Sequence, residues 1–141
     1  MSKGMYEIVQ VGVSQRYVVY LEDESGNVVL TSQYRVLKPM CLNEISWMRN
    51  AGLKDSLYEF IDADDGGLLF NVRATDAHVL GTSPVFRSEE ERMRCAEEVK
   101  RLAADAEVID RTPEIDLTTR IHDVLQTHAR EVVARAVNTT V

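Results

Sequence analysis

The stretch LLFNVRATDAHVLGTS, residues 68–83, decides the predicted fold, because residues 17–32 follow the same plan with YVVYLEDESGNVVLTS. Each consists of an apolar run, a short polar turn, a second apolar run and a closing Thr-Ser. Two apolar runs joined by a polar turn are typical of a β-hairpin. Three pairs of residues match at a spacing of 51 or 52: the closing Ser32 with Ser83, Tyr6 with Tyr58, and Tyr34 with Phe86. A repeat at a fixed period predicts a fold built from two similar units.

Each unit is predicted to contain three short strands followed by one helix. The predicted strands are 5–11, 16–23 and 28–32 in the first unit, and 57–63, 68–75 and 78–83 in the second. Their connections are too short for parallel crossovers, so the strands form antiparallel meanders. One such sheet with one helix cannot bury both of its faces, and a second unit completes the core. We therefore expect an α+β fold in which two tandem β-β-β-α units, 1–56 and 57–110, form one antiparallel sheet with helices packed on it.

The helix of each unit has recognisable ends. In the second unit Ser88 is the predicted N-cap, and Glu91 completes a capping box three residues later. In the first unit Pro39 lies in the first turn, and Gly52 stands where a left-handed residue ends a helix. The positions predicted to face the sheet are Met40, Cys41, Ile45 and Met48 in the first helix, and Cys95, Ala96, Val99, Leu102 and Ala103 in the second.

Residues 111–141 lie outside the repeats and are predicted to be a separate helical extension. Thr112 is a predicted N-cap and Pro113 a first helical residue, so an amphipathic helix is expected over 113–137. The apolar stripe of this helix consists of Leu117, Ile121, Leu125, His128 and Val132. Because a stripe of this kind has to pack against something, we expect it to contact its own domain or a partner, either in a homodimer or in a complex with another protein.

The charge of the chain argues against nucleic-acid binding as its main role. The formal net charge is −7 at pH 7, whereas nucleic-acid-binding surfaces concentrate Lys and Arg. Aromatic residues in the strands, such as Tyr17, Tyr20 and Phe70, are therefore predicted to be core residues rather than a platform for bases. No apolar run is long enough to cross a bilayer, and we expect a cytoplasmic protein that does not enter the membrane.

The chemistry-bearing residues do not form a recognisable catalytic, cofactor or metal motif. Cys41 and Cys95 have no neighbouring cysteine, so they are predicted to be buried thiols in a reducing compartment. The acidic segment DADDGG, residues 62–67, fails as a calcium loop because Arg73 occupies the position of the essential glutamate, and it is predicted to be a hairpin turn. His78 follows a turn and is expected to be exposed. No catalytic, cofactor-binding or metal-binding residue is assigned.

The segment FNVRATDAHVLGTS, residues 70–83, resembles the YegP-like repeat, a bacterial domain of unknown function found as single or tandem copies. An aromatic-led strand before it, and Phe86 with a helix after it, extend the resemblance. The first unit matches more weakly, with Tyr20 and Glu22 where the family pattern has Asn and Lys. The resemblance covers about residues 5–110 and leaves the extension unexplained.

The resemblance implies a fold but no activity, cofactor or catalytic residue. In that fold two β-β-β-α-β units form one continuous sheet and exchange their last strands. Residues 106–110 would be the last strand of the second unit, and the stretch before Tyr58 its counterpart in the first unit.

These observations favour a non-enzymatic interaction or assembly module. The alternative is a small-molecule binder or enzyme that uses the groove between the two units, where an acidic residue such as Glu59 or Asp62 suits a cationic ligand. A nucleic-acid-binding sheet is a further alternative, which the acidic charge disfavours.

Overall fold

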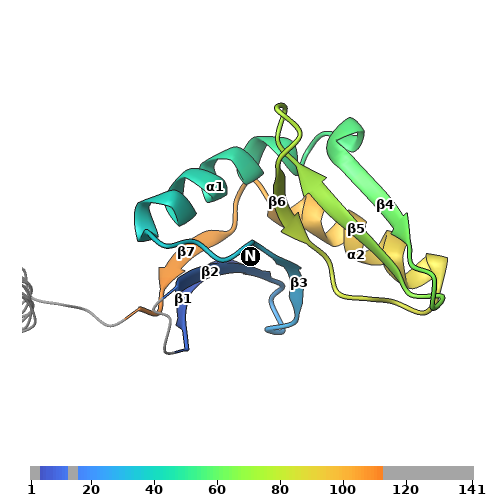
Figure 1. The fold of residues 1–141 in the computed structure, drawn as a ribbon, viewed down its shortest axis with the longest axis horizontal. Coiled ribbons are helices and arrows are strands. Elements are labelled where there is room, and N and C mark those ends of the chain that lie inside the picture. The colour runs from blue at the N-terminus through green and yellow to red at the C-terminus, as the bar shows by residue number, and fades with distance from the viewer. Residues whose placement is uncertain (1–3, 13–15, 113–141) are drawn as a thin grey trace, which may run out of the picture.

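A computed structural model describes residues 4–12 and 16–112 of the chain. These residues form an α+β fold with one mixed sheet of seven strands and two α-helices, as Figure 1 shows. The elements are β1 Met5–Val11, β2 Arg16–Glu22, β3 Val28–Thr31, α1 Lys38–Ala51, the 3₁₀ helix η1 Asp55–Leu57, β4 Tyr58–Asp62, β5 Leu68–Arg73, β6 Val79–Thr82, α2 Glu89–Leu102 and β7 Glu107–Asp110. The six strands and two helices predicted from the repeat are all present in the predicted order.

The strand order of the sheet is β4-β5-β6-β3-β2-β1-β7. β3 and β6 meet antiparallel in the middle, where Thr31 lies opposite Thr82. β7 pairs with β1 in parallel, with Met5 opposite Glu107. The sheet is therefore mixed, and the prediction of a wholly antiparallel sheet is wrong. A tight turn dictates antiparallel pairing, but β7 reaches β1 from the end of α2, so no turn sets its direction.

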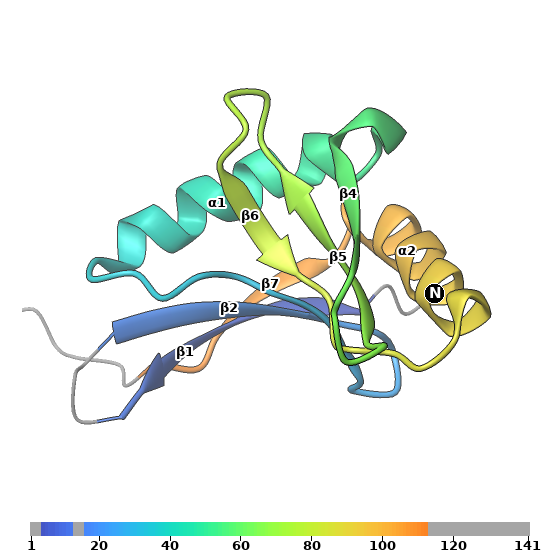
Figure 2. The same cartoon turned by 45° about the vertical axis from the view of Figure 1, so that its right-hand side comes forward.

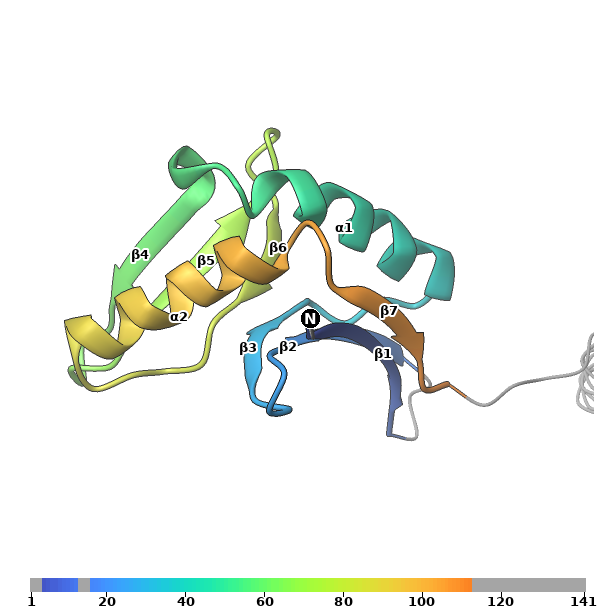
Figure 3. The same cartoon turned by 180° about the vertical axis from the view of Figure 1, so that it is seen from behind.

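The sheet bends into two wings, one of β1, β2, β3 and β7 and the other of β4, β5 and β6 (Figure 2). Both helices lie on the inner side of the bend, where they pack against strands of both wings (Figure 3). Residues from both wings and both helices form a single core cluster, which includes Tyr6, Ile8, Leu21, Cys41, Ile45, Met48, Phe70, Val72, Leu80, Ala96, Val99 and Leu102.

Residues 17–52 and 68–103 contain equivalent elements and contacts at an offset of 51 residues, whereas Tyr6 on β1 and its equivalent Tyr58 on β4 are 52 apart. The bounds of α1, 38–51, become those of α2, 89–102, when 51 is added to each. In the first half the Ser32 hydroxyl accepts a hydrogen bond from the backbone N–H of Val19 at 2.8 Å. In the second half the Ser83 hydroxyl accepts the same bond from Phe70 at 2.9 Å.

The C-terminal end of each helix accepts a hydrogen bond from a tyrosine of the other half. Tyr6 on β1 donates its hydroxyl hydrogen bond to the carbonyl of Ala103 at the end of α2, at 2.5 Å. Tyr58 on β4 donates to the carbonyl of Gly52 at the end of α1, at 2.7 Å. Each half therefore holds the helix of the other half by a buried hydrogen bond, and neither wing has a core of its own.

Three predictions of local structure are wrong. Gly52 has a right-handed φ of −61°, and a methyl group on it would lie 2.4 Å from the Cβ of Ala103, so close packing rather than a left-handed turn requires glycine there. The stretch before Tyr58 is η1, so the first unit has no counterpart of β7. Met40, predicted to face the sheet, lies in the first turn of α1 and is 44% exposed.

The match of Tyr34 with Phe86 is also wrong. Phe86 forms an isolated bridge with Leu68, the first residue of β5. In the first half the equivalent bridge joins Arg35 to Tyr17 of β2. The offset is therefore 51 along the whole of this segment. Tyr34 is exposed, whereas Phe86 packs against the core.

Other local predictions are confirmed. The Ser88 hydroxyl accepts a hydrogen bond from the N–H of Glu91 at 3.2 Å and caps α2. Gly66 has a φ of 86° in the hairpin turn between β4 and β5. Both Cys41 and Cys95 are buried free thiols. The helix predicted over 113–137 lies outside the described residues. Within residues 4–12 and 16–112, no helix has the length and apolarity needed to span a bilayer.

Candidate functional site

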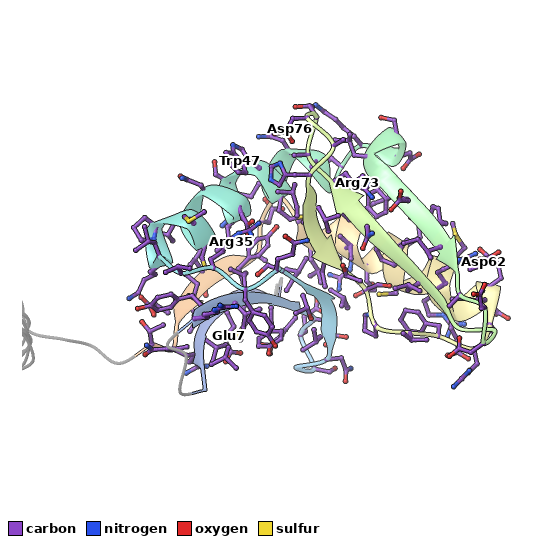
Figure 4. The ribbon with its side chains drawn as sticks, in the orientation of Figure 1. Glu7, Arg35, Trp47, Asp62, Arg73 and Asp76 are labelled. Carbon is purple, nitrogen blue, oxygen red and sulfur yellow. The ribbon has the colours of Figure 1, made fainter. Side chains whose placement is uncertain are left out.

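A groove of about 380 Å³ lies between the C-terminal end of α1 and the turn that joins β5 to β6. Its size is within the range of small-molecule sites, about 300–1,000 Å³. Figure 4 shows Trp47 on α1 beneath the turn that carries Asp76. The groove is lined by Trp47, Asn50, Ala51, Lys54, Leu57, Ala74, Thr75, Asp76 and His78. It therefore joins the helix of the first half to a hairpin of the second.

Trp47 and His78 form the aromatic wall of the groove. Their ring centroids are 5.3 Å apart and the rings meet edge to face at 76°. The Nδ1 atom of His78 lies 2.5 Å from Oδ1 of Asp76, which also accepts the backbone N–H of His78 at 3.2 Å. The hydrogen bond from His78 holds the pKa of Asp76 below its ordinary value. Asp76 thus orients the imidazole of His78, and the imidazole packs edge to face against the indole of Trp47.

The turn above the groove has a strained backbone. Ala77 has a φ of 75° and is, within the described residues, the one non-glycine residue with a positive φ. The equivalent residue in the first half is Gly26, with a φ of 86°. An alanine in this conformation costs about 1 kcal/mol relative to glycine. Arg73 donates a hydrogen bond to the carbonyl of Ala77 at 2.5 Å and so helps to hold the turn.

The equivalent place in the other half is closed by ion pairs. At an offset of 51 residues, Trp47 corresponds to Glu98, Asn50 to Arg101 and Thr75 to Glu24. Arg101 on α2 donates two hydrogen bonds to Glu24 on the turn between β2 and β3, at 2.6 and 2.8 Å. It also donates to Glu98 at 2.7 Å. The same scaffold therefore carries an open aromatic groove in one half and a closed, charged bridge in the other.

The acidic residues that the sequence suggested for the groove lie elsewhere. Glu59 and Asp62 are on β4, at the outer edge of the sheet. Glu59 accepts a hydrogen bond from Arg73 at 2.8 Å, and Asp62 accepts one from Arg92 at 2.8 Å. Both carboxylates form ion pairs, and neither residue lines the groove, so the prediction that they serve the groove is wrong. His78, expected to be exposed, is half-buried against Trp47.

Sequence analysis missed the residues that form the groove. Trp47, Asn50 and Lys54 come from the last turn of α1 and the residues after it, and their spacing matches no binding motif. The available signal was the comparison of the two units position by position, since Trp47 replaces an acidic residue and Asn50 a basic one. The predicted interface residues Leu117, Ile121, Leu125, His128 and Val132 lie outside the described residues.

Solved structures with this fold have been determined for proteins of two bacteria. The solution structure of the E. coli protein of unknown function yegP superposes with a TM-score of 0.76 at 22% sequence identity, covering 82% of this chain and 98% of that chain. The solution structure of a UPF0339 protein from Shewanella oneidensis gives a TM-score of 0.74 at 23% identity, covering 78% of this chain and 92% of that chain. The architecture is therefore the YegP-like α+β fold.

Sequence comparisons place the chain in a family. A UPF0339 protein of Acinetobacter baylyi is 33% identical over 109 residues, which cover 77% of this chain and 97% of the relative. A UPF0339 protein in the ptx operon 5′ region of Stutzerimonas stutzeri is 31% identical over 90 residues, 64% of this chain and 81% of the relative. The family described as a domain of unknown function, DUF1508, matches residues 63–110. The chain belongs to this YegP-like UPF0339 family of unknown function, as its sequence resemblance predicted.

Proposed function

We propose that this protein is a non-enzymatic binding module that holds a small ligand in the groove beside Trp47. The observation that carries the proposal is the difference between the two halves. Glu24, Arg101 and Glu98 bridge the helix and turn in one half, while the same positions in the other half leave about 380 Å³ open. A scaffold that can close this place with ion pairs, and leaves it open in one half, is suited to binding.

The lining of the groove supports a ligand with an apolar, planar part and a polar end. Ala51, Leu57 and Ala74 provide apolar surface next to the indole of Trp47, which is 49% exposed. A large exposed aromatic ring offers contact area at a low cost in conformational entropy. Lys54 also lines the groove and is exposed, so its ammonium group supplies a positive charge for the polar end of a ligand.

A binding role fits the groove better than catalysis. Asp76 and His78 form the one carboxylate–histidine contact of the described residues, and both lie on a surface turn. No hydroxyl or thiol of the described residues is hydrogen-bonded to the His78 ring, so the pair does not activate a nucleophile there.

The experiment uses the fluorescence of Trp47, which is the sole tryptophan of the chain. A metabolite library is screened by thermal shift, and each hit is titrated while the Trp47 emission is followed. A ligand of the groove is expected to raise the Tm and to change the emission with the same midpoint.

A variant that copies the closed half provides the test of location. The triple substitution Trp47→Glu, Asn50→Arg and Thr75→Glu places the Glu98–Arg101–Glu24 arrangement in the groove and is expected to fold and to lose the thermal shift. Met93→Ala, on the outer side of α2, is the matched control and is expected to keep it. Binding that survives in the folded triple variant, or a library without any hit, contradicts the proposal.

We also propose that the chain is divided into three parts. Residues 1–56 and 57–110 act as two YegP-like repeats, and 111–141 as a separate helical extension. The repeated order of elements and the contacts at an offset of 51 residues support this division. An interaction role for the extension is compatible with a ligand in the groove, because β7 ends beside the start of α1 and the groove lies at the opposite end of that helix.

A further inference from the structure

The start of α1 presents apolar side chains at positions where the start of α2 presents polar ones. Leu37 is the N-cap of α1 and makes no side-chain capping bond, whereas Ser88 caps α2. The first turn of α1 contains no acidic residue, whereas that of α2 contains three. At the offset of 51 residues, Val36 corresponds to Arg87, Leu37 to Ser88 and Met40 to Glu91.

These apolar side chains are exposed in the described part of the chain. Val36 is 70% exposed, Leu37 59% and Met40 44%, and Tyr34 next to them is also exposed. We call these four residues the α1-start surface. A missing N-cap costs a helix about 1 kcal/mol, and negative charge in the first turn would add stability that α1 forgoes. The first half therefore gives up helix stability at the place where it exposes apolar area.

The chain leaves the described fold next to this surface. Lys38, the first residue of α1, forms an ion pair with Asp110 at the end of β7, with 2.8 Å between Nζ and Oδ2. The backbone N–H of Arg111 donates to the carbonyl of Ile8 at 2.8 Å, which fixes the direction of the chain as it leaves the sheet. Figures 1 and 3 show the end of β7 and the start of α1 at the same end of the molecule.

We propose that the C-terminal extension of the same chain docks on the α1-start surface through Leu117 and Ile121. The extension contributes 29 residues after Thr112, and the sequence predicts a helix from residue 113. In a helix Leu117 and Ile121 share one face, and Ile121 lies about 12 Å along the axis from residue 113. The two side chains thus stay within reach of a surface that lies beside the exit point.

The tether favours the chain's own extension over that of a second copy. A segment attached through a short connection has an effective concentration of about millimolar, which is above the concentration of free protein in most conditions. Docking removes apolar area of the extension and of the α1-start surface from water, and this burial stabilises the contact. This inference is independent of the groove, which lies at the other end of α1.

Amide chemical shifts of the full-length protein test the docking. The double variant Leu117→Ser and Ile121→Ser leaves residues 4–112 unchanged in sequence. Relative to the unmodified protein, we expect the amide resonances of residues 34–38 and 40 to shift and those of the equivalent residues 85–89 and 91 to stay in place. Unshifted resonances for residues 34–38 and 40 overturn the proposal.

A second variant approaches the contact from the other side. Val36→Arg, Leu37→Ser and Met40→Glu give α1 the residues of α2, so this triple variant adds an N-cap and is expected to remain folded. Resonances of residues 117–121 are expected to move in this variant. If they do not, the α1-start surface is not the docking site.

Dilution distinguishes the occupants. Docking within one chain predicts shifts that do not change between millimolar and micromolar protein, and light scattering that reports a monomer. Shifts that are lost on dilution, together with a dimer at high concentration, overturn docking within the chain and assign the surface to a second copy.

Discussion

For the substitution Gly52→Ala, helix propensity and tertiary packing predict opposite changes in the free energy of unfolding. Gly52 ends α1 in the right-handed helical conformation, with φ −61° and ψ −17°. In that conformation alanine is favoured over glycine by up to about 1 kcal/mol. The added Cβ, however, would lie 2.4 Å from the Cβ of Ala103 and 3.0 Å from the carbonyl oxygen of Met48. Local propensity thus predicts a gain in stability and packing predicts a loss.

The packing effect is expected to be the larger one. Two carbon atoms in ordinary contact are about 3.5–4.0 Å apart, so the ends of α1 and α2 must separate by more than about 1 Å. Overpacking of this kind costs about 1–3 kcal/mol. The carbonyls of Gly52 and Ala103 also accept the buried hydroxyls of Tyr58 and Tyr6, and displacement weakens these bonds by about 1 kcal/mol each. The net expectation for Gly52→Ala is a loss of about 3 kcal/mol, or about 12 °C in Tm.

The measurement is urea unfolding followed by circular dichroism, with the m-value as a check that the transition remains two-state. Ala103→Gly alone is expected to cost about 1 kcal/mol, because it removes a buried methyl group and helix propensity. The double variant Gly52→Ala with Ala103→Gly removes the clash, so a coupling of about 1–2 kcal/mol is expected between the two changes. A single variant Gly52→Ala that is as stable as the unmodified protein, or strict additivity in the double variant, refutes this account.

Three further predictions follow from buried or paired groups. Burial raises the pKa of Cys41 to about 11 and that of Cys95 to about 12. Neither thiol is therefore expected to react with a disulfide reagent at about pH 8 until the protein is unfolded. Rapid labelling of the native protein contradicts this expectation. Ser83→Ala removes the acceptor of a buried backbone N–H of β5 and is expected to lower the free energy of unfolding by about 1–3 kcal/mol, measured in urea, with no change as the contrary result. Because His78 lowers the pKa of Asp76, the ionised carboxylate stabilises the fold above the unfolded-state pKa of about 3.9 and loses this effect as the pH falls through the folded-state pKa. Asp76→Asn should therefore lower the Tm near neutral pH, and lower it progressively less below about pH 4. A difference in Tm between the two proteins that is independent of pH contradicts this expectation.

The location of the secondary structure was largely predictable from the sequence. The apolar runs and turns around residues 17–32 and 68–83 predicted β2, β3, β5 and β6 to within one or two residues of their observed ends. Ser88 and Glu91 predicted the start of α2 because their capping bond is local. Where side chains contact neighbours a few positions away, the sequence pattern carries the information.

Residues whose role depends on distant neighbours were not predictable in the same way. The pattern placed Met40 on the apolar face of α1, because a helical stripe alone does not show where the sheet ends beneath the first turn. It suggested Glu59 and Asp62 for the groove, although both belong to the edge strand β4, where they pair with Arg73 and Arg92.

What the sequence determined by itself was the set of strands and helices, the presence of two equivalent halves in one fold and the YegP-like resemblance, because hydrophobic periodicity and turn residues act over short distances along the chain. Only the tertiary structure decided that β7 lies parallel to β1, that each helix end is held by a tyrosine of the other half, and that Trp47 meets His78 across a groove. Apart from the bond between Tyr58 and Gly52, which joins residues six apart, these features depend on segments about 30 to 100 residues apart, and their packing is set by the shared core rather than by neighbouring residues.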